Sequence, residues 1–289
     1  MVILSNYHSD GSLMTAHFDP LRGMNLTSLR LKNQEILDQS TRSLFQQRNA
    51  GLGALIGPHF HHRSLDKIPK NFPQELFPHL LYQNKDQGEP FSHGIARYVP
   101  WKYEASSTQI KAWLNGSDLY QGLALKTFEG FNFSLHLDAI LLHDGLLLDY
   151  SIDADLPCVI GFHYYYPSTP DSFVEGLVKP FCRDKNGWGG IKSSWFDQKN
   201  SKLHFSLDQE ADFGFMPLHE QNSSSNLISL KTNKHHLLIS YTSSNEEETS
   251  WQLFHPKEAT YVCLEPLSAL NPFNPVLTRN RLQIKISYS

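Results

Sequence analysis

Residues 131–137 read Phe131-Asn132-Phe133-Ser134-Leu135-His136-Leu137, and apolar side chains alternate there with polar ones. After His143-Asp144-Gly145, a second apolar run extends from Leu146 to Ile152. An alternation with a period of two places the apolar residues on one face of a β-strand. Asp-Gly between two such runs is among the stronger sequence signals for a β-hairpin. We therefore predict two antiparallel strands joined by a tight turn over residues 131–152.

Runs of the same kind recur along most of the chain, whereas helical periodicity sustained over three turns is scarce. Further strands are predicted at Leu26–Leu31, Gln109–Leu114, Cys158–Tyr164, Lys202–Leu207, His235–Tyr241, Trp251–Phe254, Thr260–Glu265 and Arg281–Tyr288. With 289 residues, of which 40% are hydrophobic, the chain can bury a substantial core. All-β sandwiches of this size often form one domain. The predicted fold class is all-β, a large antiparallel β-sandwich that occupies residues 1–289 as a single domain.

The stretch from Gly51 to Pro100 differs from the rest of the chain. It is rich in Pro, His and Gly and has little periodicity. A loop-rich region of this length inside a compact domain is usually functional. We therefore expect it to contribute to a binding site.

Composition excludes several classes of protein. A net charge of −4 and a pI near 6.4 do not provide the basic surface that nucleic-acid binding requires. No apolar run reaches the length of a membrane span, and the N-terminus lacks the basic start and apolar core of a signal peptide. The three cysteines have no C-x-x-C spacing, which is typical of free thiols in a reducing compartment. The predicted location is the cytoplasm; the oligomeric state is not indicated.

Three short segments, far apart in the chain, each contain an ionisable side chain suited to carbohydrate chemistry. They are Phe91-Ser92-His93-Gly94-Ile95-Ala96-Arg97, Gly161-Phe162-His163-Tyr164-Tyr165-Tyr166-Pro167 and Cys263-Leu264-Glu265-Pro266-Leu267-Ser268. Opening a cyclic hemiacetal requires one group to protonate the ring oxygen and another to take the proton of the C1 hydroxyl. A His and a Glu suit that task near neutral pH. In this order and at these separations, the segments resemble the galactose mutarotase (aldose 1-epimerase) family, whose fold is a β-supersandwich.

His163 lies near the end of a predicted strand that Pro167 terminates, on the same face as Gly161 and Tyr165. Gly161 leaves room beside it for a ligand or a close backbone. The alternative is a hydrogen-bonded His beside a tyrosine cluster. The resemblance implies that His163 is the general acid of the reaction.

Glu265 ends an apolar run, and Pro266 is expected to terminate that strand. Burial at the end of a core strand would raise the pKa of the carboxyl group toward that of a general base. The alternative is an ordinary Glu at a strand end facing water. The resemblance implies that Glu265 is the base, and we expect the functional atoms of His163 and Glu265 to lie about 5–9 Å apart, flanking a sugar ring.

The resemblance also implies substrate-binding residues. His93 is expected near C1 and the ring oxygen, and Arg63 at the sugar hydroxyls; both should line the cleft of the catalytic pair. Trp188 lies in a Gly-rich turn, where deep burial is unfavourable, and is expected to line or cap the pocket. The family's substrate-binding Asp has two candidates, Asp197 and Asp212. For Arg97 we favour a structural salt bridge.

Alternative interpretations remain at this stage. The cluster His59, His61 and His62 suggests a metal site, but adjacent histidines of an extended chain point in different directions, so no metal and no other cofactor is predicted. The leading hypothesis is a cofactor-independent aldose 1-epimerase, an isomerase acting on a small-molecule sugar, with no nucleic-acid or membrane partner. The alternatives are a hexose-6-phosphate 1-epimerase, a non-catalytic carbohydrate-binding protein on the same fold, and a lyase-type β-sandwich domain.

Overall fold

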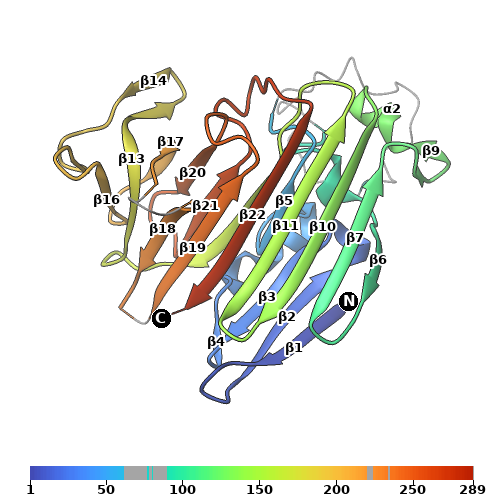
Figure 1. Ribbon diagram of the computed structural model, residues 1–289, viewed down its shortest axis with the longest axis horizontal. Helices are drawn as coiled ribbons and strands as arrows, with labels where there is room; N and C mark the ends of the chain where they lie inside the picture. The colour runs from blue at the N-terminus through green and yellow to red at the C-terminus, as the bar shows by residue number, and fades with distance from the viewer. Residues whose placement is uncertain (62–76, 78–79, 81–89, 220–223, 234, 289) are drawn as a thin grey trace.

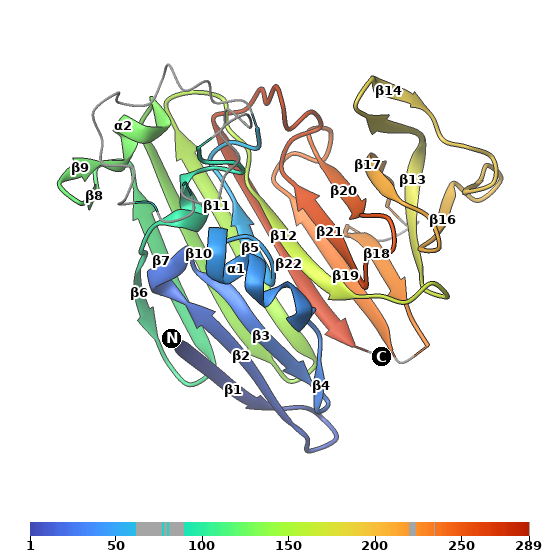
Figure 2. The same cartoon turned by 180° about the vertical axis from the view of Figure 1, so that it is seen from behind.

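The computed structural model describes residues 1–61, 77, 80, 90–219, 224–233 and 235–288. Its strands are almost entirely antiparallel, and twenty of them form one continuous hydrogen-bonded system (Figure 1). The pairing divides this system into two layers that face each other across the core (Figures 1 and 2). The prediction of an all-β sandwich is confirmed. Within the described part of the chain, every helix is too short or too polar to cross a membrane.

The first layer contains both the N-terminal strands and the strands that carry His163 and Glu265 (Figure 2). In spatial order it consists of β1 (Val2–Tyr7), β2 (Leu13–Asp19), β3 (Asn25–Leu31), β5 (Gly53–Ile56), β12 (Gly161–Pro167), β21 (Tyr261–Leu267), β20 (Ser250–His255), β17 (Ala211–Pro217), β13 (Phe173–Asp184) and β14 (Gly187–Gly190), with β4 (Gln34–Glu35) beside β3.

The second layer is built around the hairpin predicted above and lies in front in Figure 1. In spatial order it consists of β6 (Lys102–Ala105), β7 (Gln109–Asn115), β10 (Phe133–Leu142), β11 (Gly145–Ala154), β22 (Arg279–Tyr288), β19 (His236–Ser243), β18 (Asn226–Lys231), β13 again, β16 (Lys202–Ser206) and β15 (Phe196–Asp197). The remaining elements are short: α1 (Arg42–Arg48), α2 (Leu125–Glu129), the 3-10 turns η1 (Pro20–Arg22), η2 (Gln39–Thr41) and η7 (Ile95–Tyr98), and the hairpin β8 (Leu119–Tyr120) and β9 (Leu123–Ala124).

Strand β13 belongs to both layers. Its first half pairs with β16 and β18 in the second layer, and from Val178 onward it pairs with β17 in the first. The change of partner coincides with an irregular register between Val178 and Cys182. Such a bulge bends a strand and increases its twist. The bend carries the end of β13, with Arg183, toward the outer face of the first layer.

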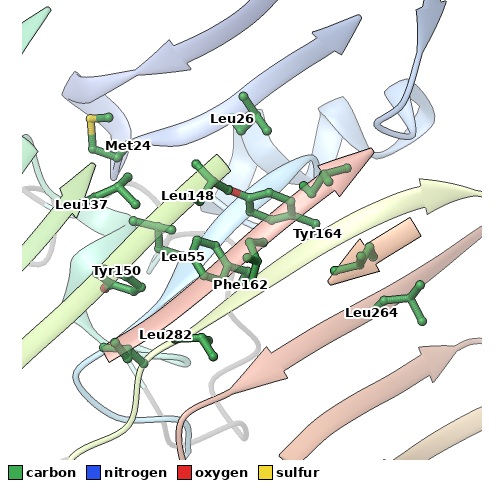
Figure 3. Close-up of a cluster of buried hydrophobic side chains, with 14 of the residues drawn as sticks. Met24, Leu26, Leu55, Leu137, Leu148, Tyr150, Phe162, Tyr164, Leu264 and Leu282 are labelled. Atoms are coloured by element: carbon green, nitrogen blue, oxygen red, sulfur yellow. The ribbon is translucent and has the colours of Figure 1, made fainter. Parts of the chain in front are cut away.

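The core lies between the two layers (Figure 3). The side chains contributed by the first layer include Leu26, Leu55, Phe162, Tyr164 and Leu264, and those from the second include Leu137, Leu148, Tyr150 and Leu282. Each of these nine is at most 2% exposed. Full burial of an aliphatic or phenylalanine side chain is worth about 1.5–3 kcal/mol. A core of this extent holds the first layer rigid, so that its outer face can carry ionisable groups.

The predicted hairpin is confirmed as β10 and β11, with a small shift of the turn. Leu142 pairs with Gly145, so the two-residue loop is His143-Asp144 and Gly145 opens the return strand. A Cβ at Gly145 would lie 2.2 Å from the Ile286 carbonyl oxygen of β22. Glycine is therefore favoured here both by the close approach of a neighbouring strand and by its φ of 151°.

Two predicted strands have different boundaries in the structure. Pro266 does not terminate its strand, because β21 continues to Leu267. On one side, Pro266 pairs in register with Trp251 of β20. On the other side, the ladder between β12 and β21 is interrupted between the pairs Gly161–Leu267 and Tyr164–Leu264. A proline has no N–H to donate, and the ladder opens where that donor is missing. The strand predicted at Cys158–Tyr164 is displaced to Gly161–Pro167, ending at the proline as expected.

Candidate functional site

His163 and Glu265 lie directly opposite each other on neighbouring strands of the first layer. The flanking pairs Gly161–Leu267 and Tyr164–Leu264 fix this register, and residues opposite each other point to the same face of a sheet. His163 Nε2 lies 3.2 Å from Glu265 Oε1. His163 is 7% exposed and Glu265 2%. The two side chains singled out from the sequence thus form one buried pair.

The separation of about 5–9 Å expected from the sequence was therefore wrong, since the observed contact is 3.2 Å. The expectation placed the two groups on either side of a sugar ring. The ring oxygen and the C1 hydroxyl, however, are bonded to the same carbon atom. Groups that serve these two oxygens can stand side by side, as two opposed residues of adjacent strands do.

Burial dominates the electrostatics of the pair. Desolvation raises the pKa of Glu265 to about 8, against the lowering influence of the Arg97 guanidinium, while the charge of Asp212 raises it further. Burial holds the pKa of His163 well below its ordinary value, and Arg97 lowers it further. Both groups thus favour their neutral forms, as expected when a charge leaves water. Burial therefore favours a protonated carboxyl group on Glu265 beside a neutral His163.

His93 approaches this pair from the loop that precedes η7. Its ring centroid lies 5.1 Å from that of His163, and Ser92 Oγ lies 2.7 Å from its Nδ1. Its backbone has a φ of 67°, an uncommon conformation for a residue other than glycine and one often found at functional sites. Gly94 follows with a φ of 86°, and a Cβ there would lie 2.0 Å from the carbonyl oxygen of Gly57. The glycine allows two loops to meet, and this contact fixes His93.

Arg97 does not form the salt bridge that we favoured from the sequence. It is 4% exposed, and its Nε donates to the carbonyl oxygen of Leu55 at 3.0 Å. Its Nη2 is buried without a hydrogen-bond partner among the described residues, and none of their carboxylates pairs with it. A buried cation of this kind is costly unless it serves a site. Arg97 influences the pKa values of Glu265, His163 and His93, which makes it the main source of positive charge near the pair.

His163 and Glu265 line a pocket of about 450 Å³ on the outer face of the first layer. Its lining includes Arg48, Phe60, His61, His93, Arg97, His163, Tyr165, Asp212, Gln252, Phe254, Glu265 and Phe273. The volume lies within the range of small-molecule sites, which is about 300–1,000 Å³. Tyr165 stacks on the His163 ring with centroids 4.9 Å apart. Aromatic faces beside polar groups are suited to the C–H and O–H surfaces of a sugar.

Of the two Asp candidates, the structure places Asp212 in this pocket. Asp212 Oδ1 accepts a hydrogen bond of 2.5 Å from Nε2 of Gln252. Gln252 lies opposite Glu265 on β20 and is a pocket residue that sequence reasoning missed. Asp197 lies on β15 of the second layer, where it binds the backbone N–H groups of Lys199 and Asn200.

The remaining predicted site residues are not among the described residues that line the pocket. Arg63 and His62 fall outside the described residues. Trp188 does not line the catalytic pocket; it is 36% exposed on β14, with its ring 5.9 Å from the guanidinium carbon of Arg183. Tyr165 and Phe273 also line the pocket and were not identified as site residues from the sequence, whereas His61 was considered only as a possible metal ligand. Tyr165 could have been found, because it shares the strand face of His163.

Of the histidine cluster considered as an alternative metal site, His59 and His61 lie within the described residues. His59 Nδ1 contacts Glu129 Oε2 at 3.0 Å, whereas His61 faces the pocket. Glu129 Oε1 also accepts from the N–H of Ile95 at 2.9 Å, so this carboxylate anchors the loop that carries His93. A different described group has the spacing of metal ligands: donor atoms of His93, His163 and Glu265 lie within 4.8 Å of one another.

Comparison with solved structures identifies the fold. A galactose mutarotase-like protein from Clostridium acetobutylicum superposes with a TM-score of 0.68 at 13% identity, covering 100% of this chain and 98% of its own. A galactose mutarotase-like protein from Lactobacillus casei gives 0.65 at 16% identity, with 100% of both chains covered. A candidate aldose 1-epimerase from Escherichia coli K12 gives 0.65 at 12% identity, covering 100% and 99%.

These similarities establish that the chain has the galactose mutarotase-like fold over its whole length. No protein-family model matches this chain. No curated protein matches it either. Function therefore has to be argued from the site.

Proposed function

We propose that the chain is a cofactor-independent aldose 1-epimerase that interconverts the α and β anomers of a hexose. The observation that supports this proposal is the His163–Glu265 pair, which consists of two buried ionisable groups 3.2 Å apart at the base of a pocket of sugar size. Strongly perturbed carboxyl and imidazole groups in a concave site are typical of general acid–base catalysis. The galactose mutarotase-like fold is consistent with it.

In the proposed reaction, His163 protonated at Nε2 donates to the ring oxygen while the Glu265 carboxylate accepts the proton of the C1 hydroxyl. The bond between C1 and the ring oxygen breaks, and C1 becomes an aldehyde carbon. After rotation about the C1–C2 bond, the freed hydroxyl attacks the other face of the aldehyde. Glu265 returns its proton to the carbonyl oxygen, and His163 recovers one from the attacking hydroxyl. All atoms and protons are restored.

A single proton shared by the pair is sufficient for this cycle. In the resting pair the proton resides mainly on Glu265, because burial disfavours both charges. Its transfer to His163 across the 3.2 Å contact creates the form that acts on the cyclic sugar. The nearby guanidinium of Arg97 stabilises the carboxylate of that form. The pair then titrates as a unit rather than as two separate groups.

The other pocket residues would bind and orient the sugar. His93 would hydrogen-bond near C1, since its ring lies beside His163. The carboxylate of Asp212 and the amide of Gln252 provide acceptors and donors for hydroxyl groups, and the ring of Phe273 provides an apolar wall. Arg63 keeps its proposed role in substrate binding.

The test is anomer exchange measured by NMR or polarimetry on freshly dissolved sugars. The panel contains aldohexoses and their 6-phosphates, because Arg48 and Arg97 both line the pocket and could receive a phosphate. We expect at least one sugar to equilibrate faster than in buffer, and His163→Asn to remove the acceleration. Faster exchange confined to 6-phosphates would identify a hexose-6-phosphate 1-epimerase. Binding without acceleration would identify a non-catalytic carbohydrate-binding protein and contradict the proposal.

A metal-dependent reaction is the second candidate, favoured by the ligand-like spacing of His93, His163 and Glu265. Two histidines and one carboxylate are a known ligand set for divalent metals. The buried Arg97 opposes this reading, because its positive charge would repel a dication. Metal analysis of protein purified without an affinity tag distinguishes the two. We expect no stoichiometric metal and no loss of activity after chelation; loss of activity restored by one metal ion would favour the second candidate.

A further inference from the structure

A second hollow adjoins the catalytic pocket on the outer face of the first layer. It has a volume of about 350 Å³. Three of its lining residues, Asp212, Gln252 and Phe273, also line the catalytic pocket. The others come from the end of β13, from the turn into β14 and from the loop after β21. A ligand that fills the catalytic pocket can therefore extend into the second hollow along their shared wall.

The register of the sheet connects the two hollows. Starting from His163, each strand in turn contributes the residue directly opposite, which gives a cross-sheet row of His163, Glu265, Gln252, Gly214, Arg183 and Trp188. Such residues point to the same face. The row begins with the catalytic pair and ends at β14, which projects from the layer at the same end as β13 (Figure 2). One continuous tract thus runs from the reacting pair across the sheet.

Arg183 is the buried charge of the second hollow. It is 5% exposed, and its Nη2 donates to Gln252 Oε1 at 3.0 Å. Among the described residues, its Nε has no hydrogen-bond partner and no carboxylate forms an ion pair with it. The guanidinium carbon lies 5.0 Å from the ring of Phe273 and 5.9 Å from that of Trp188. A buried guanidinium held by an amide and two rings keeps donor capacity for oxygen atoms of a ligand.

Gly214 provides the space for this arrangement. A Cβ at this position would lie 2.7 Å from Arg183 Nη2 and 3.0 Å from Gln252 Oε1. Any larger residue would displace the guanidinium or break its hydrogen bond. The second hollow is thus a built feature of the sheet, not a chance gap between surface side chains.

The charges of the second hollow indicate the class of ligand. Arg183 and Lys185 are balanced by Asp184 and Asp212, and the aromatic ring of Phe273 forms part of the wall. A phosphate or sulfate group would meet the two carboxylates as well as the two cations. A neutral polyol can donate to the carboxylates, accept from the cations and place a C–H face on the ring.

We propose that the second hollow is a subsite for a further sugar unit attached to the hexose, so that the substrate class is a reducing oligosaccharide. The hexose at the reducing end occupies the catalytic pocket, and the attached unit lies against Arg183. This inference rests on the proposed epimerase function. Both sugar units then contribute binding energy, so a disaccharide is expected to bind more tightly than its hexose alone.

The test compares a reducing disaccharide with its own hexose, using maltose, cellobiose and lactose against glucose and galactose. We expect at least one disaccharide to have a KM about tenfold lower than its hexose, the difference that one charge-assisted hydrogen bond can make. Arg183→Met should remove this preference. Lys185→Ala should reduce it, and Lys179→Ala, at an exposed position of β13 outside the second hollow, is the matched control. Equal KM values for every pair, with active enzyme, would overturn the subsite and leave the epimerase function standing.

A binding measurement separates the two proposals. Calorimetry with Glu265→Gln, which retains the pocket without its base, measures affinity in the absence of turnover. Tighter binding of a disaccharide than of its hexose supports the subsite even if no sugar is epimerised by the wild type. Equal affinity, or preferential binding of a hexose 6-phosphate, would contradict it. If Arg183→Met fails to fold, Lys185→Ala in the same assay decides the question.

Discussion

The ionisable side chains on the outer faces of the two layers differ in exposure and in pairing. On the second layer, acidic and basic side chains pair across β11 and β22: Arg281 Nε contacts Asp149 Oδ1 at 2.8 Å, and Arg279 Nε contacts Asp153 Oδ2 at 2.8 Å. Most of these side chains are well exposed. On the first layer, Glu265 and His163 are buried and favour their neutral forms.

This contrast separates structural charge from functional charge. Exposed ion pairs contribute about 0–1 kcal/mol each, so the second layer can gain or lose them with little effect. Buried ionisable groups without a full complement of partners reduce stability and persist where chemistry requires them. His93, which precedes η7, lies over this side of the layer, with its ring centroid 5.1 Å from that of His163. The same β-sheet architecture thus has an exposed, ion-paired surface on one layer and a buried pair of ionisable groups on the other.

The largest expected effect is on the rate. Glu265→Gln keeps the shape of the side chain and removes the proton acceptor, and His163→Asn removes the donor. We expect kcat for each variant to fall by about 10²–10⁴-fold, the usual contribution of general acid–base catalysis, with little change in KM. The double variant should be hardly slower than the poorer single variant, because the two groups act as a unit.

Glu175→Gln is the matched control for this substitution. Glu175 belongs to the second layer, where it contacts Lys202 at 2.8 Å and Lys231 at 3.0 Å. The same chemical change should leave kcat unchanged there. A rate for Glu265→Gln equal to that of the wild type would show that the base is another residue.

The second effect is on pH dependence. The active pair binds one proton, which is lost as the pH rises through the pKa of Glu265, raised by burial to about 8. We expect kcat/KM to decline above about pH 8, by about tenfold per pH unit. The acidic limb should lie below the ordinary pKa of histidine, because burial lowers the pKa of His163. A kcat/KM that keeps rising from pH 8 to pH 10 would contradict a shared proton.

The third effect is on stability. The folded-state pKa of Glu265 is raised from 4.5 to about 8, so the folded protein holds a proton that the unfolded chain releases. The stability that this group contributes is present in full below about pH 4.5 and is lost as the pH rises toward 8. We expect Glu265→Gln to melt close to the wild type at pH 5 and several degrees above it at pH 9, by calorimetry. If the wild type melted at a higher temperature than Glu265→Gln at pH 9, the Glu265 carboxylate would have to be stabilised by a partner.

The sequence predicted the fold class and the central hairpin, because alternation is a local signal. It also singled out His163 and Glu265, through a resemblance of three short segments to a known family; their catalytic role stays a prediction. It did not predict that His163 and Glu265 are opposed in register, since pairing between strands about a hundred residues apart depends on the whole sheet. The same reason explains why Gln252 and Arg183 were missed. Neither residue belongs to a local motif, and each becomes part of a site only through the cross-sheet row.

Arg97 and Pro266 show where local rules mislead. A lone Arg in a loop is usually an exposed or ion-paired residue, but the loop of Arg97 is packed against the sheet, and its guanidinium lies inside. A proline usually ends a strand. At Pro266, however, the ladder between β12 and β21 is open beside His163 and Glu265, so no N–H is needed on that side. In both cases the tertiary environment of the site overrides the local preference.

The smallest expected effect is on the second layer, at Asp149. Arg281 lowers the pKa of Asp149 through a side-chain hydrogen bond, and Gln283 lowers it further. Because its folded-state pKa is depressed, Asp149 contributes stability above its ordinary pKa of 3.8 and loses it as the pH falls. Asp149→Asn should therefore reduce the free energy of unfolding by no more than about 1 kcal/mol at pH 7, with a difference that shrinks toward pH 3 and with 1 M salt. Its kcat should equal that of the wild type. Denaturant unfolding at the two pH values measures the first expectation, and anomer exchange measures the second; a loss of activity without a loss of stability would show that the second layer also takes part in the reaction.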